Sequence, residues 1–164
     1  MAMIWALTLA PLAAAAYARA AHPVEFPRNA SPLQPPPRTF AVVWSTIYLL
    51  LGAFLARTRH TPVFRYILPL ALLNMALNLS WPHRTYRGGA DGVRDGWLAI
   101  HAMSLTVVAM MILAGPDRLA QLMLTPYLVW LHAAAGLLQT SAPPASLAAT
   151  GDPIASNPRG TARA

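Results

Sequence analysis

The sequence predicts an all-α integral membrane protein built as a bundle of five transmembrane helices, and two observations support this prediction. Of the 164 residues, 56% are hydrophobic and only 10% are charged, whereas a soluble domain carries about 25% charged residues. A helix crosses a bilayer core of about 30 Å in roughly 20 residues. Five stretches of about that length, or longer, lack any charged side chain: 1–18, 39–56, 66–82, 96–116 and 119–151.

The first span is expected at residues 2–21. The pattern Ala18-Arg19-Ala20 also fits the cleavage site of a signal peptide, but the first charge, Arg19, follows the apolar run, which favours an uncleaved helix. Pro11 should bend this helix. Small residues recur every four positions and either let another helix approach closely or merely reflect the high alanine content; they are Ala6, Ala10, Ala14 and Ala18.

The other four spans are expected at residues 39–56, 63–82, 97–114 and 118–139. Prolines between residues 22 and 37 exclude regular helix from the first connection. Charges and glycines between residues 84 and 96 predict a loop, and Gly115-Pro116-Asp117 predicts a tight turn. Residues 1–140 therefore form one membrane domain, followed by a tail, 141–164, whose Ala, Pro and Ser content predicts disorder.

The charge pattern concerns the membrane rather than nucleic acid. All 12 basic residues are arginines, against 5 acidic residues, and they flank the apolar spans instead of forming one cluster. We therefore expect the lipid bilayer, and no nucleic acid, as a partner. More arginines fall on the side of the first loop than on the opposite side, so the positive-inside rule places the N-terminus outside and the C-terminus inside.

The residues for common enzyme chemistry are missing from the spans. The chain has no cysteine, and no carboxylate or arginine lies at the centre of a span, where a proton pump usually needs one. His101 and His132 lie within spans and either ligate a metal or haem iron, relay protons or hydrogen-bond a neighbouring helix. Neither has a second ligand three or four residues away, so the packing role is favoured and we expect no metal site and no obligatory cofactor.

Aromatic and amide side chains share helix faces. Trp44 and Tyr48 are four residues apart, and Asn74, Asn78 and Trp81 follow helical spacing in the third span. Intramembrane asparagines either bind a ligand or hydrogen-bond another helix. Trp5 and Trp97 fit an interfacial belt, whereas Trp44 and Trp130 lie deeper. Flat aromatic faces with a few polar groups suit a planar apolar ligand.

Three motifs in this order resemble the TspO/MBR family, the tryptophan-rich sensory proteins that include the mitochondrial translocator protein, or peripheral-type benzodiazepine receptor. They are Pro35-Pro36-Pro37 leading into Phe40, Trp44 and Tyr48; Asn78-Leu79-Ser80-Trp81; and Pro126-Tyr127-Leu128-Val129-Trp130. The chain departs from the family pattern at Leu33 and Arg38 near the prolines, at Thr85-Tyr86, and at Leu138 in place of an asparagine, so it resembles a divergent bacterial member.

The resemblance implies a pocket that opens toward the first loop and binds porphyrin, haem or other apolar ligands, for sensing, transport or stress regulation in a bacterial membrane. The implied ligand-binding residues are Trp44, Tyr48, Asn78, Trp81, Tyr127 and Trp130. The resemblance also implies a homodimer. Two alternatives stay open: light-dependent porphyrin degradation, with Trp44 and Trp130 as the reactive residues, and a pocketless interaction protein that uses the alanine stripe of the first span.

Overall fold

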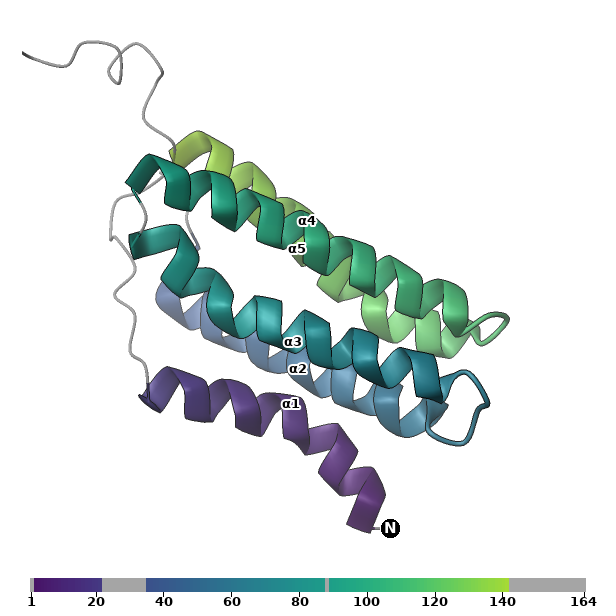
Figure 1. The fold of residues 1–164 in the computed structure, drawn as a ribbon. Helices are drawn as coiled ribbons and strands as arrows, with labels where there is room; N and C mark the ends of the chain where they lie inside the picture. The colour runs from purple at the N-terminus through teal and green to yellow at the C-terminus, as the bar shows by residue number, and fades with distance from the viewer. Residues whose placement is uncertain (1, 22–34, 88, 142–164) are drawn as a thin grey trace, which may run out of the picture.

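The computed structural model describes residues 2–21, 35–87 and 89–141, and all regular structure within them is α-helical. This confirms the predicted all-α class (Figure 1). The expected tail and most of the first connection, including Leu33, lie outside the described residues. The helices are α1 (Ala2–Ala21), α2 (Pro37–Thr58), α3 (Phe64–Arg87), α4 (Gly89–Leu113) and α5 (Arg118–Ser141).

The five helices lie side by side as a bundle, and their order around it differs from their order in the chain (Figure 1). α2 packs between α1 and α5, and α4 packs between α5 and α3, so the neighbours run α1, α2, α5, α4, α3. The consecutive helices α2 and α3 touch only slightly. This order places the aromatic face of α2 against α5. It also lets the two asparagines of α3 reach side chains of α4, α5 and α2.

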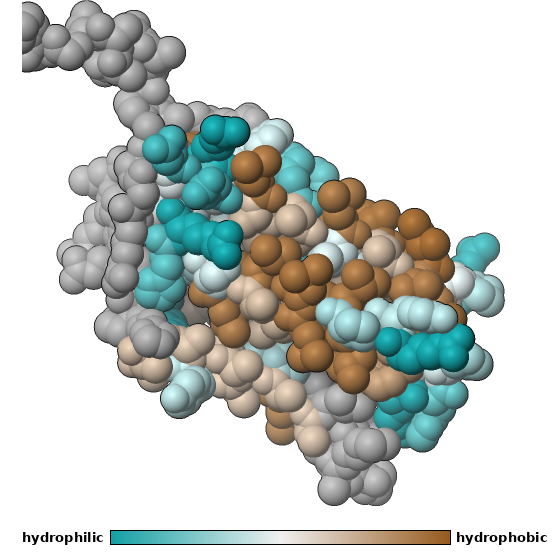
Figure 2. All heavy atoms as spheres, viewed as in Figure 1, coloured by the Kyte–Doolittle hydropathy of each residue, from teal (hydrophilic) through white to brown (hydrophobic). Residues whose placement is uncertain are grey.

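The face of the bundle seen in Figure 2 is apolar across its middle, with polar residues gathered toward both ends. Large hydrophobic side chains point outward on several helices, among them Leu72, Leu105 and Val129. Among the described residues, three stretches are long and apolar enough to cross a membrane: Arg38–Thr58, Asp91–Leu113 and Arg118–Leu138. An apolar belt of this size marks a lipid-facing surface.

Helix α1 contains Pro11 within its length and is bent in Figure 1. It packs mainly against α2. Of its alanine stripe, Ala6, Ala10 and Ala14 are exposed and Ala18 is half-buried, so most of the stripe faces away from the bundle. Homodimer formation through this stripe stays a prediction.

The prediction of a loop between residues 84 and 96 is wrong, because the described residues on both sides of position 88 are helical. Two glycines that suggested a loop instead allow α4 to approach α3 closely. A Cβ atom at Gly92 would lie 2.8 Å from the carbonyl oxygens of Arg84 and Thr85, and one at Gly96 would collide with the Thr85 side chain. Lack of a side chain at a helix crossing explains these glycines better than backbone flexibility does.

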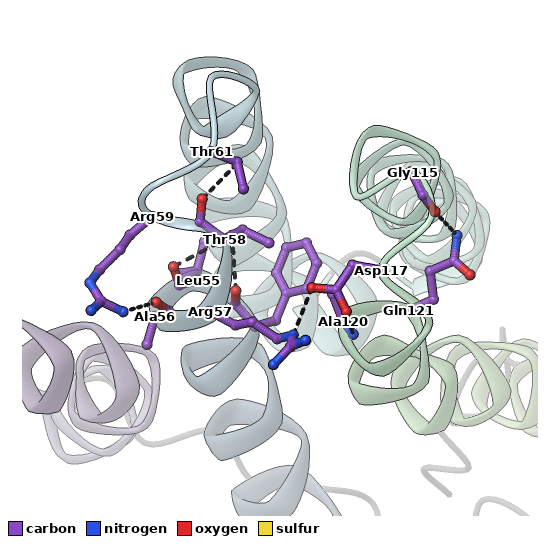
Figure 3. A network of polar contacts seen from close by, with 11 residues as sticks. Leu55, Ala56, Arg57, Thr58, Arg59, Thr61, Gly115, Asp117, Ala120 and Gln121 are labelled. Atoms are coloured by element: carbon purple, nitrogen blue, oxygen red, sulfur yellow. Dashed lines mark hydrogen bonds and ion pairs between the residues drawn. The ribbon is translucent and has the colours of Figure 1, made fainter.

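The turn predicted between the last two helices ties α2 to α5 (Figure 3). Gly115 has a φ of 60°, a conformation that favours glycine. Asp117 accepts a hydrogen bond from the Ala120 backbone N–H (3.1 Å), which caps α5, and its other oxygen accepts one from Arg57 Nε at 2.7 Å. The Arg57 guanidinium, together with the cap, lowers the pKa of Asp117.

Candidate ligand-binding site

The first part of the candidate site is an aromatic cluster between α2 and α5. Phe40, Trp44 and Tyr48 recur every four residues, so they form one face of α2. The Trp44 ring stacks on Tyr48 at 5.6 Å between centroids and meets Trp130 at 6.4 Å with the ring planes perpendicular. Phe40 contacts Trp130 edge-on at 5.6 Å, and Trp44 contacts Tyr127 in the same way at 6.0 Å. These edge-to-face contacts are the favoured aromatic geometry.

The second part is a continuous chain of buried hydrogen bonds that links α2, α3, α5 and α4. The Tyr48 hydroxyl donates to Asn78 Oδ1 at 2.6 Å, and Asn78 Nδ2 donates to the Tyr127 hydroxyl at 2.9 Å. The Tyr127 hydroxyl in turn donates to Asn74 Oδ1 at 2.7 Å, and Asn74 Nδ2 donates to Thr106 Oγ1, also at 2.7 Å. Each amide oxygen thus has a donor and each amide nitrogen an acceptor.

This network explains why two asparagines are tolerated inside the bundle. Asn74 and Asn78 are both buried, and a buried amide without partners is costly. Interhelical hydrogen bonds in membrane proteins contribute about 0.6 kcal/mol on average and up to about 1.7 kcal/mol. The main effect is therefore to specify one packing register, because any other register leaves several polar groups unpaired.

The indole N–H of Trp130 is a polar group of this cluster that has no hydrogen-bond acceptor among the described residues. Its Nε1 atom is buried, yet no described residue accepts a hydrogen bond from it. An indole nitrogen only donates, and leaving a buried donor unpaired costs about 1–3 kcal/mol. The site thus combines a flat aromatic wall with one free donor.

The structure brings together five of the six predicted ligand-binding residues, and they lie on three helices. The remaining one, Trp81, is buried on the side of α3 that faces α4, where its Nε1 donates to the Gly96 carbonyl at 3.2 Å. Whether any of the six contacts a ligand stays a prediction. The connected residues are Trp44, Tyr48, Asn78, Tyr127 and Trp130.

Three further residues belong to the cluster although the predicted site omitted them. Phe40 continues the four-residue spacing of Trp44 and Tyr48, and that spacing was a sufficient signal. Asn74 shared a predicted face with Asn78, but its link to Tyr127 was not visible in the sequence. Thr106 had no signal at all, because its role depends on α4 packing beside α3.

The two intramembrane histidines lie outside this cluster, on the exposed faces of α4 and α5. His101 Nδ1 lies 3.0 Å from the Trp97 carbonyl, and His132 Nδ1 lies 2.8 Å from the Leu128 carbonyl. Each ring therefore bonds its own helix, and the expectation of a bond to a neighbouring helix is wrong. The described part of the chain contains no group of three His, Asp or Glu side chains that suits a metal ion.

Taken together, the apolar belt, the five helices and the hydrogen-bonded aromatic interior define a helical integral membrane protein with a specialised core. A model of the TspO/MBR family matches residues 2–140, and the chain belongs to this family. The chain is also 32% identical over 105 residues to Translocator protein 2 of Mus musculus. That match covers 61% of the chain and 65% of the mouse protein, just under two thirds of its length.

The departures from the family motifs have structural places. Leu138 is buried in the apolar core, and Arg38 is exposed near the start of α2. Thr85 is buried against Gly96 at the α3–α4 crossing. Because Gly96 lacks a side chain and Thr85 fills the space above it, a larger aromatic residue at position 85 would separate the two helices.

Proposed function

We propose that this protein binds a tetrapyrrole, such as a porphyrin or haem, or a similar planar apolar ligand, between α2 and α5. The supporting observation is the buried Trp130 Nε1, which none of the described residues engages. A ligand that offers an oxygen or nitrogen acceptor at this place removes the cost of the unpaired donor. Tetrapyrroles combine a flat apolar ring with carboxylate acceptors, and both features match the wall and the donor.

The surrounding contacts favour a flat ligand over a flexible one. Trp44, Tyr48 and Tyr127 are held by stacking or by buried hydrogen bonds, so the aromatic wall has little freedom. A rigid wall binds a rigid planar ring at a lower entropic cost than it binds a flexible chain. We infer that the protein uses this binding in tetrapyrrole sensing, transport or stress regulation in a bacterial membrane.

A titration with metal-free protoporphyrin tests the proposal. The full chain, purified in detergent and kept in the dark, is titrated while tryptophan fluorescence is recorded. We expect saturable quenching. We expect Trp130→Phe to weaken binding by about 5- to 150-fold, because the substitution leaves a smaller aromatic ring and removes the N–H donor, a loss of about 1–3 kcal/mol.

The matched control for this titration is Trp97→Phe, which removes an exposed indole on α4. The control lowers the total fluorescence but should leave the dissociation constant unchanged. Equal affinity in wild type and Trp130→Phe would remove the assigned role of the indole N–H. Absence of any saturable quenching in the wild-type protein would overturn the proposed function and favour the pocketless interaction protein.

A second candidate function is light-dependent porphyrin degradation. The perpendicular contact between Trp44 and Trp130 favours it, because neighbouring oxidisable indoles can relay an electron from a photoexcited porphyrin to dioxygen. The porphyrin is then oxidised, dioxygen is reduced, and the indoles return to their starting state. Illumination of the titrated samples tests this candidate. If Trp44→Phe and Trp130→Phe each degraded porphyrin as fast as the wild-type protein does, these two residues would be excluded from the reaction.

A further inference from the structure

The buried hydrogen-bond chain has a direction, and a backbone carbonyl on α4 fixes it. The Met103 carbonyl oxygen lies 3.2 Å from Asn74 Nδ2 and 2.7 Å from Thr106 Oγ1. A carbonyl oxygen only accepts hydrogen bonds, so both neighbouring groups must donate to it. Asn74 therefore turns its amide nitrogen toward α4 and its amide oxygen away from it.

This orientation passes from one residue to the next toward α2. The amide oxygen of Asn74 accepts the hydrogen of the Tyr127 hydroxyl at 2.7 Å. Because a hydroxyl has a single hydrogen, Tyr127 can only accept from Asn78, whose Nδ2 lies 2.9 Å away. Asn78 then presents its oxygen to Tyr48, and the Tyr48 hydroxyl donates to it at 2.6 Å. The hydroxyl hydrogen of Tyr48 is thus committed inside the protein.

The chain therefore leaves the Tyr48 hydroxyl able only to accept a further hydrogen bond. Its oxygen keeps acceptor capacity after it donates to Asn78, and no described residue donates a hydrogen bond to it. Trp130 Nε1, by contrast, is a donor that has no acceptor among the described residues. The cluster thus contains one unused acceptor and one unused donor.

The two unused groups belong to one aromatic wall. The Trp44 ring stacks on Tyr48 at 5.6 Å between centroids and meets Trp130 edge-on at 6.4 Å. Both rings therefore border Trp44, so one planar ligand that lies against this wall can contact both. A ligand acceptor next to Tyr48 would face lone pairs, whereas the same acceptor next to Trp130 would face a hydrogen.

We propose that Asn74, held by α4, sets the specificity of this site: it makes Tyr48 an acceptor, so the site selects ligands that carry a hydrogen-bond donor as well as an acceptor. The inference rests on the proposed binding of a planar apolar ligand between α2 and α5, and it adds which polar groups that ligand must carry. A ligand with carboxamide groups meets both demands, whereas an ester offers acceptors alone. Asn74 acts through Tyr127 and Asn78, so it is a positioning residue.

Two porphyrins that differ in this property provide the probes. Metal-free protoporphyrin diamide carries amide donors and acceptors at its edge, and metal-free protoporphyrin dimethyl ester has the same ring with edge acceptors alone. Each probe is titrated in the dark into the full chain in detergent while tryptophan fluorescence is recorded. We expect the wild-type protein to bind the diamide about 2- to 10-fold more tightly than the ester, the effect of one additional hydrogen bond.

The ratio of the two dissociation constants separates specificity from stability, because a general loss of packing weakens the binding of both probes alike. Tyr48→Phe removes the acceptor, so this variant should bind the two probes equally. Asn74→Leu removes the oxygen that holds the Tyr127 hydrogen. Tyr127 can then donate to Asn78, the Asn78 amide can turn over, and the Tyr48 hydroxyl is freed to donate to a ligand. This variant should also bind the two probes equally, because the ester gains a donor at Tyr48.

The matched control is Ser104→Ala, which also lies on α4. The half-buried Ser104 hydroxyl donates to the Ile100 carbonyl of its own helix at 2.9 Å. Its loss leaves the interhelical chain intact and should keep the wild-type ratio.

The outcomes distinguish this inference from the proposed function. Equal affinities of the wild-type protein for the two probes, or a wild-type ratio in Tyr48→Phe, would overturn the assigned polarity. A wild-type ratio in Asn74→Leu with a native circular dichroism spectrum would overturn the role of Asn74, and if that variant does not fold, Tyr48→Phe decides. If neither probe quenched the wild-type fluorescence saturably, the proposed function would fall and this inference with it.

Discussion

At the residue scale, Tyr127 is the junction of the buried polar network. Its hydroxyl accepts from Asn78 Nδ2 at 2.9 Å and donates to Asn74 Oδ1 at 2.7 Å, while its ring contacts Trp44. One side chain thus connects both asparagines of α3 to the aromatic wall. Because the residue is only 1% exposed, water cannot replace these bonds.

Replacement of Tyr127 by Phe should destabilise the bundle. The ring remains, but one donor on Asn78 and one acceptor on Asn74 lose their partner, which costs about 1–3 kcal/mol. Unfolding by sodium dodecyl sulfate in mixed micelles, followed by circular dichroism, measures the change in free energy.

A matched control for this prediction is Thr46→Val. The Thr46 hydroxyl bonds the Val42 carbonyl of its own helix at an exposed position, so its loss should change stability by less than about 0.5 kcal/mol. Equal stability of Tyr127→Phe and the control would show that the network adds nothing to stability.

At the scale of the elements, α3 and α4 approach each other closely at two glycines of α4. A Cβ atom at Gly92 would lie 2.8 Å from two backbone carbonyl oxygens of α3, and backbone cannot move aside as a flexible side chain can. Gly136 on α5 is also helical, but a Cβ atom there would meet nothing within 4 Å. These two glycines therefore respond to the same substitution in opposite ways.

Gly92→Ala should destabilise the protein by about 1–3 kcal/mol, because the helices must separate to accept the methyl group. Gly136→Ala should be neutral or stabilise the protein by up to about 1 kcal/mol, because alanine favours a helix more than glycine does. The same detergent unfolding measurement tests both. If the two variants had the same free energy of unfolding, α4 would not approach α3 as closely at Gly92 as the structure indicates.

At the scale of the whole molecule, an ion pair at the α4–α5 turn joins two residues that lie 60 positions apart in the sequence. Arg57 at the end of α2 bonds Asp117, which also caps α5 (Figure 3). Both side chains are partly exposed, at 41% and 32%, so we expect a modest effect that salt screens. The pair links the neighbouring helices α2 and α5 where α2 ends and α5 begins.

The pH dependence of stability should report this pair. The pKa of Asp117 is lower in the folded protein than the ordinary value of 3.8, so its contribution is present above about pH 4 and is lost as the pH falls through the lowered value. Thermal denaturation from pH 6 to pH 2.5 measures it.

The control variant for the pH series is Asp117→Asn. An asparagine keeps an oxygen for the helix cap but has no charge for Arg57. The melting temperature of wild type should exceed that of the variant above about pH 4, and the two values should converge at the acid end. A constant difference across this range would mean that Asp117 does not act through its charge.

The sequence predicted the helical fold well, and part of the candidate site, because those features are local. Hydrophobic stretches near 20 residues long mark membrane helices, and the spacing of Trp44 and Tyr48 marks one face of a helix. The prediction of a loop between residues 84 and 96 was wrong, because it too rested on local composition alone. Gly92 and Gly96 are typical of a loop by composition, whereas the structure places both in α4, where the absence of a side chain lets α4 approach α3 closely.

By itself, the sequence determined the class of protein: an all-α membrane bundle with aromatic and amide faces inside it. Only the tertiary structure decided which faces meet. The bond between Tyr127 and Asn74 joins residues 53 positions apart, and the one between Asn74 and Thr106 spans 32 positions. The indole N–H of Trp130, from which no described residue accepts a hydrogen bond, is also a tertiary result, because a donor is unpaired only relative to the neighbours that packing places around it.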